Sequence, residues 1–240
     1  MYIDFHPTIL YTCIQDCGVK ILVEIISASD IYEHIKSNII NFEYPPSCRL
    51  TENEIANKFN VSRTPVKVAF TRLENEGFLE VLPQRGTYVT KLNATKTKDF
   101  IYLRTCLEEK ITIEFMNICT EQDCEILSKF LEEQTKTISK IDFKAEEFFV
   151  LDSKFHAYIF ERTNHLGIWD EISKLTVNYT RYRMADLLES QNFNQLVKEH
   201  YNLFNAIKNK EEEKYKVILS QHLTGNFNKA INTKLKEYFY

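Results

Sequence analysis

The chain of 240 residues is 44% apolar and has a formal charge of −4, from 30 Lys and Arg against 34 Asp and Glu. This length and apolar content suffice for two cores, of roughly 70 and roughly 140 residues. No run of about 18 uncharged apolar residues is present, which excludes a membrane-spanning helix, and six cysteines without a secretory signal or a C-x-x-C pair are typical of a soluble cytoplasmic protein with reduced thiols.

Residues 1–27 form an N-terminal extension to which the sequence assigns no role. The segment 19–26 (VKILVEII) is apolar and β-branched, which is compatible with a short strand or with the start of a helix. Cys13 and Cys17 are spaced i, i+4. Reduced thiols are the simpler interpretation, and an oxidation sensor or a soft-metal site is the alternative.

Residues 28–92 are predicted to form a winged helix-turn-helix domain. A stripe of isoleucines predicts its first helix, over residues 31–40. The capping-box spacing of Thr51 and Glu54 predicts the start of a second helix, because the hydroxyl and the carboxylate can each satisfy a free amide at a helix N-terminus. Asn60 then supplies a turn.

The third helix of this domain is predicted to begin at Ser62, which can cap it, with Pro65 in the first turn, where a missing N–H costs little. Its apolar stripe consists of Val66, Ala69, Phe70 and Leu73. Its opposite face carries Arg63, Thr64, Lys67 and Thr71. Because such donors can reach phosphates and base edges in a major groove, this helix is a candidate DNA-reading element.

A hairpin is predicted to follow this helix as a wing. Gly77 ends the helix in a left-handed position, and residues 78–82 and 87–91 indicate two strands joined by a Pro-Gln-Arg-Gly turn with Arg85 at its tip. Residues 49–91 carry more cations than anions, although the chain as a whole is acidic. Since phosphate neutralisation supplies most non-specific affinity, we expect weak non-specific DNA binding and reliance on dimeric, sequence-specific contacts.

This region resembles a known DNA-binding domain. The stretch NKFNVSRTPVKVAFTRLENEGFLEVLPQRGTYV is similar to that of the GntR family of bacterial transcription regulators. The resemblance implies DNA contacts by Ser62, Arg63, Thr64, Lys67, Arg85 and Gly86. Lys67 stands where the family commonly has arginine, which replaces a bidentate guanine contact by a point-charge contact, and Ser47 replaces the glycine of a Pro-Gly turn. Reuse of the domain as a protein interaction module is the alternative interpretation.

After a polar linker over residues 93–98 (NATKTK), residues 99–240 are predicted to form a helical domain. Amphipathic periodicity indicates six helices, over residues 96–118, 121–139, 143–163, 167–188, 192–208 and 211–236. The predicted fold class is therefore mainly α, with an N-terminal winged helix-turn-helix followed by an all-helical bundle of about six helices.

Four polar residues interrupt the apolar stripes of this bundle. Asp152 and His156 lie four apart on one predicted helix, and His200 and His222 occupy aliphatic positions on two others. A buried unsatisfied polar group costs on the order of 1–3 kcal/mol, and one divalent metal bound by all four would offset that cost. Three imidazoles and one carboxylate suit zinc or nickel, whereas separately hydrogen-bonded core histidines are the alternative.

The helical region is similar to the FCD effector-binding domain of the FadR-like branch of GntR regulators, through the segments LDSKFHAYIFERTNH, KEHYNLFNAIKN and LSQHL. Metal-binding members of that branch use an aspartate and three histidines at positions that match Asp152, His156, His200 and His222. The resemblance also implies a small carboxylate effector, whose oxygen completes the metal shell. Six rather than seven helices place the chain nearer to the VanR-like subgroup.

Three arginines are candidate effector ligands. Arg104 matches a common family arginine and can pair with a carboxylate bidentately. Its alternative role is an i, i+4 bridge to Glu108 on the surface. Arg181 and Arg183 are weaker candidates, for which a solvated side chain is the favoured alternative.

Together these features predict a homodimeric, ligand-responsive transcription regulator that binds a palindromic DNA operator. One alternative keeps DNA binding but makes the metal itself the signal. The other is a metal-dependent hydrolase fused to a winged domain, since three histidines and an aspartate can activate water. No additional in-stripe carboxylate is available as a general base, so we expect the protein not to be an enzyme.

Overall fold

The computed structural model describes residues 26–175, 177–231 and 234–240. The predicted strand or helix over 19–26 and the cysteines at positions 13 and 17 thus lie almost entirely outside the described residues. The chain divides into two compact units, residues 1–91 and residues 92–240. Within the described part, no helix has both the length and the apolar character needed to cross a bilayer.

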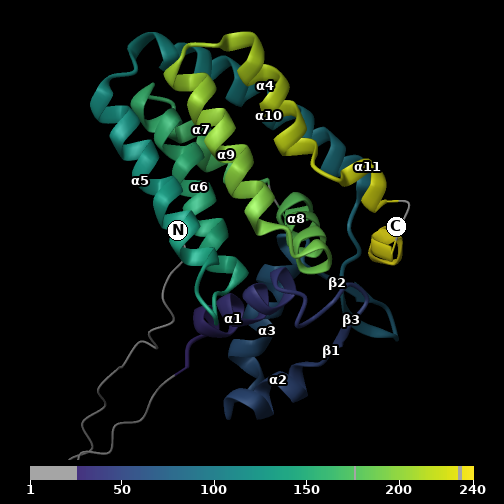
Figure 1. The fold of residues 1–240 in the computed structure, drawn as a ribbon. Helices are drawn as coiled ribbons and strands as arrows, with labels where there is room; N and C mark the ends of the chain where they lie inside the picture. The colour runs from purple at the N-terminus through teal and green to yellow at the C-terminus, as the bar shows by residue number, and fades with distance from the viewer. Residues whose placement is uncertain (1–25, 176, 232–233) are drawn as a thin grey trace, which may run out of the picture. The chain divides into compact units, whose positions relative to one another are not determined.

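The N-terminal unit is a winged helix-turn-helix, as predicted (Figure 1). Its elements in chain order are α1 (Ala28–Ile40), β1 (Arg49–Leu50), α2 (Glu52–Phe59), α3 (Arg63–Asn75), β2 (Leu79–Leu82) and β3 (Gly86–Val89). The three strands form one antiparallel sheet in the order β1-β3-β2. The short β1 therefore completes the wing on the side of β3 that β2 leaves free.

The starts of α1 and α2 are fixed by local side-chain caps. Ser27 and Asp30 form a reciprocal capping box at the start of α1. The helix therefore begins three residues earlier than the isoleucine pattern predicts. At α2 the Thr51 hydroxyl accepts from the Glu54 N–H, as predicted, but the Glu54 carboxylate accepts from that same hydroxyl and not from the Thr51 N–H. Ser62 precedes α3 in the N-cap position, yet its hydroxyl makes no capping hydrogen bond.

The core of this unit lies between α1 and α3, whose apolar stripes are fully buried. A polar clamp joins the two helices at one end. The Tyr32 hydroxyl on α1 donates to Glu76 Oε2 at the end of α3 over 2.5 Å, and Lys36 Nζ lies 3.1 Å from the same oxygen. The Arg72 guanidinium covers the Tyr32 ring at 3.5 Å from its centroid. Glu76 thereby connects the end of α3 to residues of α1 that lie 40 and 44 positions earlier in the sequence.

The C-terminal unit is a helical bundle, as predicted. Its elements are α4 (Ala94–Ile118), α5 (Glu121–Ile138), α6 (Ala145–Arg162), α7 (Leu166–Lys174), α8 (Val177–Ser190), α9 (Phe193–Lys208), α10 (Glu212–Thr224), α11 (Phe227–Ala230) and the 3-10 helix η1 (Lys234–Tyr238). Asn93 caps α4 by accepting from the Lys96 N–H, so the residues expected as a linker begin this helix.

Two predicted helices of the bundle are each broken. The segment 167–188 comprises α7 and α8, and the segment 211–236 comprises α10, α11 and the start of η1. Gly225 follows α10 with φ of 48° and ψ of −131°, a conformation that favours glycine and ends the helix there. The count of six helices, on which the likeness to the VanR-like subgroup was based, therefore depends on how these broken segments are counted.

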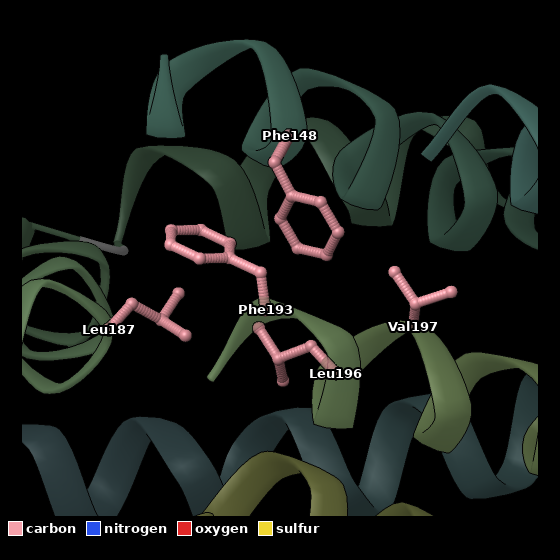
Figure 2. Close-up of a cluster of buried hydrophobic side chains, with 5 residues drawn as sticks. All are labelled: Phe148, Leu187, Phe193, Leu196 and Val197. Atoms are coloured by element: carbon pink, nitrogen blue, oxygen red, sulfur yellow. The ribbon is translucent and has the colours of Figure 1, made fainter. Parts of the chain in front are cut away.

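The long helix α4 packs against α6, α8, α9 and α10, while α5 packs against α6 and α9. An apolar cluster ties α6, α8 and α9 together, and Figure 2 shows its side chains converging. It consists of Phe148, Leu187, Phe193, Leu196 and Val197. Phe148 lies one turn before Asp152, and Leu196 lies one turn before His200. The cluster therefore fixes the rotation of both helices that supply these polar side chains.

The clamp between α1 and α3 makes a stability prediction. Replacing Tyr32 by Phe keeps the ring under Arg72 but removes the hydroxyl that donates to Glu76, so we expect the free energy of unfolding to fall by about 1–2 kcal/mol. Chemical denaturation of the full chain measures this. Tyr44→Phe is the matched control, because the Tyr44 hydroxyl contacts only the exposed Lys58 ammonium, at 3.2 Å. Equal stability of the two variants would contradict the assigned clamp.

Candidate functional site

The residues expected to contact DNA lie on the surface of the N-terminal unit. Ser62, Arg63, Thr64 and Lys67 are exposed at the start and on the outward face of α3, and Arg85 is exposed at the tip of the wing. Neither Arg63, Lys67 nor Arg85 forms an ion pair within the described residues, whereas the inner cations Lys36 and Arg72 are paired with Glu76. The outward cations are thus available to an anionic partner.

Arg49 extends the cationic surface onto the sheet. Its side chain lies over Gly86, such that a Cβ at that position would come within 3.0 Å of Arg49 Nε. Gly86 also has φ of 118°, a backbone conformation that favours glycine. Sequence reasoning did not single out Arg49, because only the pairing of β1 with β3 brings it beside the wing.

A second group of polar residues lies inside the helical unit. Asp152 and His156 from α6, His200 from α9 and His222 from α10 place one potential ligand atom each within 4.8 Å of all the others. The three imidazoles are almost fully buried, with exposures of 0–2%. The structure therefore brings together the four residues that were predicted to share a metal.

Each histidine of this cluster presents its Nδ1 atom to an oxygen outside the cluster. His200 Nδ1 is hydrogen-bonded to Gln134 Oε1 at 2.7 Å, and His222 Nδ1 to Glu199 Oε2 at 3.0 Å. His156 Nδ1 lies 2.8 Å from Glu108 Oε2. Because amide and carboxylate oxygens only accept, the two hydrogen bonds place the proton of His200 and of His222 on Nδ1 and leave their Nε2 atoms with a lone pair.

The inner atoms of the cluster lack hydrogen-bond partners. Neither His156 Nε2 nor His200 Nε2 makes a hydrogen bond among the described residues. His200 Nε2 lies 3.1 Å from Asp152 Oδ1. With the His200 proton on Nδ1, two lone pairs face each other across that distance. Such an arrangement is repulsive unless a cation lies between them, and the donor set of three imidazoles and one carboxylate suits a divalent metal.

Burial and neighbouring charges keep Asp152, His200 and His222 in metal-binding form. Burial would raise the pKa of Asp152, but His200 and the other two imidazoles outweigh it and hold that pKa far below its usual value. Burial, reinforced by the neighbouring imidazoles and Arg183, lowers the pKa of His222 well below its usual value. A negative carboxylate and neutral imidazoles are the states that bind metal.

A buried ion pair supports the cluster from α4. Arg104 Nε donates to Glu108 Oε1, and the two side chains are only 7% and 1% exposed. Burial alone would raise the pKa of Glu108, but Arg104 and His156 outweigh it and lower the pKa to about 2. The i, i+4 bridge considered for these residues thus exists, but it lies in the interior and contacts the cluster.

The three candidate arginines occupy different surroundings. Arg104 Nη2 is buried and makes no hydrogen bond within the described residues, and its guanidinium lies 5.4 Å from the ring centroids of both Trp169 and Tyr179. Arg183 Nη1 donates to the His222 carbonyl, which places it beside the cluster. Arg181 is fully buried, and burial lowers its pKa to about 10, with Tyr240 opposing the shift.

Sequence reasoning missed the outer partners of the histidines, which are Glu108, Gln134 and Glu199. Gln134 is 0% exposed, and its polar side chain at a core position of α5 was the available signal. Glu108 was considered only as a surface residue. Glu199 precedes His200 directly, and periodicity gives no reason to expect it at the cluster.

The cluster predicts bound metal in the purified protein. Elemental analysis of the full chain should give about one divalent ion per chain. His200→Ala should lose that ion and also lower the melting temperature, because the metal stabilises the folded state. His165→Ala is the control, since His165 is partly exposed and lies 3.3 Å from Glu114, away from the four ligands. Equal metal content in both variants would refute the site.

Comparison with known proteins identifies both units. Residues 27–89 match the family described as bacterial regulatory proteins, gntR family, and residues 99–225 match the FCD domain. The transcriptional repressor RspR of Escherichia coli K12 is 29% identical over 195 residues, covering 80% of this chain and 84% of that protein. The gluconate operon transcriptional repressor of Bacillus subtilis is 29% identical over 183 residues, covering 74% and 72%.

Solved structures share the fold. Escherichia coli McbR/YncC superposes with a TM-score of 0.63 at 22% identity, covering 85% of this chain and 97% of that one. A putative GntR regulator from Rhodococcus sp. RHA1 gives 0.67 at 17% identity, covering 86% and 98%. The family matches place this chain among transcription regulators and not among enzymes. The chain belongs to the GntR family of bacterial transcription regulators and carries an FCD domain at its C-terminal side.

Proposed function

We propose that this GntR regulator binds a palindromic operator as a homodimer, and that a small carboxylate bound near a divalent metal in the FCD domain controls its operator affinity. The proposal combines an unpaired cationic face with a buried four-ligand cluster. The observation that carries the sensor half is the contact between His200 Nε2 and Asp152 Oδ1, 3.1 Å apart without a hydrogen bond. We place its action in the cytoplasm, where operator DNA is found.

The DNA-binding half rests on the exposed face of α3 and the wing. Ser62, Arg63 and Thr64 occupy the start of α3, where backbone N–H groups and side-chain donors can hold a phosphate. Lys67 lies one turn further along and can reach a base edge or a second phosphate. Arg85, with Gly86 allowing close approach, suits a contact from the wing to the backbone.

The metal-binding part of the proposal rests on Asp152, His156, His200 and His222. Zinc or nickel matches this ligand set, and the outer contacts of the three Nδ1 atoms hold the rings in the required orientation. When bound, the ion supplies a Lewis-acidic position that an oxygen of an anionic ligand can share.

The effector-binding part of the proposal rests on Arg104, with Arg183 nearby. Arg104 has one paired and one unpaired guanidinium nitrogen, so it can bind a carboxylate while it remains bonded to Glu108. Arg104 and Arg183 both raise the local positive potential near Asp152. Arg181, the other candidate, is buried and interacts electrostatically with Tyr240. We therefore rank it behind Arg183.

Substitutions on α3 test the DNA-binding half. With an operator selected from random duplexes, Lys67→Ala should weaken binding by about 1–3 kcal/mol, and Arg63→Ala should weaken it more. Fluorescence anisotropy at several salt concentrations measures affinity, and losing one phosphate contact should reduce the salt slope by about one. Lys96→Ala, which removes an exposed lysine on α4, is the control. Operator affinities equal to that control would overturn the assigned face.

Arg104→Lys tests the effector half, because lysine keeps the charge next to Glu108 but loses the bidentate fork. Acetate, lactate and malate should shift operator affinity of the wild-type chain, and the variant should lose most of that shift while its metal content stays unchanged. If instead operator affinity follows added zinc or nickel beyond one ion per chain and ignores all carboxylates, the metal itself is the signal.

A further inference from the structure

Two cysteines meet at the corner between α4 and α5. Cys119 ends α4 and Cys124 lies in the first turn of α5. Their Sγ atoms are 3.7 Å apart, and both residues are partly exposed. This site lies outside the histidine cluster and outside the DNA-binding face, and neither of the proposed roles uses it.

The corner that holds the two thiols is itself well fixed. Thr120 and Asp123 form a reciprocal capping box at the start of α5. Asp123 also accepts from the Tyr158 hydroxyl and the Arg162 guanidinium, each over 2.6 Å, which ties the corner to α6. A disulfide has an S–S distance of about 2.0 Å, so the sulfurs need to approach by only about 1.7 Å. The thiols are therefore held close to bonding geometry before any oxidation.

We propose that Cys119 and Cys124 form a reversible oxidation site, which reacts with a hydroperoxide and closes to an intramolecular disulfide. The corner positions both sulfurs, and their partial exposure admits a small oxidant. The site requires no sequence motif, since the two cysteines are separated by four residues and meet through the turn between helices.

The two thiols take different parts in the reaction. Burial and the hydrogen bond with Cys124 raise the pKa of Cys119 to about 12, with Asp123 adding to the shift and Lys210 opposing it. Cys119 thus stays protonated, and the first attack falls to Cys124. Thiolate at Cys124 attacks one peroxide oxygen, the O–O bond breaks, and the hydroxide that leaves takes up a proton to become water.

Closure follows from the resulting sulfenic acid on Cys124. Cys119 sulfur attacks the Cys124 sulfur, the S–O bond breaks, and the hydroxyl leaves with the Cys119 proton as a second water. The two thiols have then lost two electrons and two protons, and the peroxide has been reduced to two waters. A thiol reductant reverses the modification by exchange.

Mass spectrometry of the full chain tests this assignment. The reduced protein is treated with a small excess of hydrogen peroxide, alkylated with N-ethylmaleimide and digested with a glutamyl endopeptidase, which cleaves after Glu121 between the two cysteines. We expect a disulfide-linked pair of peptides that carry Cys119 and Cys124 and that separate on reduction. Cys106, which is exposed on α4, serves as the internal reference.

Three variants complete the test. Cys106→Ser should form the linked pair as the wild-type chain does, whereas Cys119→Ser and Cys124→Ser should not form it. In Cys119→Ser the remaining Cys124 should proceed to sulfinic acid, because no resolving thiol is present. The proposal fails if wild-type Cys119 and Cys124 are alkylated as fully as Cys106 after peroxide, or if either one is found linked to a different cysteine. The wild-type result decides the matter even if a variant misfolds.

Discussion

The helical unit depends on one electrostatic constraint, which is that three buried imidazoles and a carboxylate face a common point. Burying such groups without partners costs several kcal/mol. Outer oxygens are hydrogen-bonded to the Nδ1 atoms of His200 and His222, but the inner atoms of His156 and His200 have no hydrogen-bond partner among the described residues. A divalent ion bound there, as proposed, would resolve this imbalance, because it would take the inner lone pairs that no described side chain satisfies. The apolar packing shown in Figure 2 holds α6 and α9 at the rotation that keeps these donors together.

A chain of contacts connects the candidate effector residue to the cluster. Arg104 bonds to Glu108, Glu108 lies against His156, and His156 is one of the four potential ligands. A carboxylate on Arg104 Nη2 would add negative charge beside Glu108 and so alter the charge that faces His156. The same helix begins at Asn93, directly after the DNA-binding unit in the sequence. Under the proposed function, α4 is thus the element through which ligand binding affects the DNA-binding unit.

The winged domain and the four candidate ligands were predictable from the sequence, because both depend on local residue patterns. The stripe on α3 and the turn residues of the wing depend on neighbours only a few positions away. Asp152 and the three histidines stood out because each occupies an apolar position of a helical stripe. Long-range partners were not predictable in this way. Gln134 and Glu108 meet the histidines from other helices, and Arg49 reaches Gly86 only through strand pairing. The end of α7 at Lys174 and the end of α10 before Gly225 interrupt stripes that continue in the sequence.

The central claim is that one metal ion lies among Asp152, His156, His200 and His222. A crystal structure of the purified full chain with anomalous data at the zinc and nickel edges tests it most directly. The account predicts a single anomalous peak bound by the three Nε2 atoms and an Asp152 oxygen, at about 2.0–2.2 Å from each. The contradicting result is no peak at that position, with the imidazoles turned so that their Nε2 atoms are hydrogen-bonded to protein groups or water.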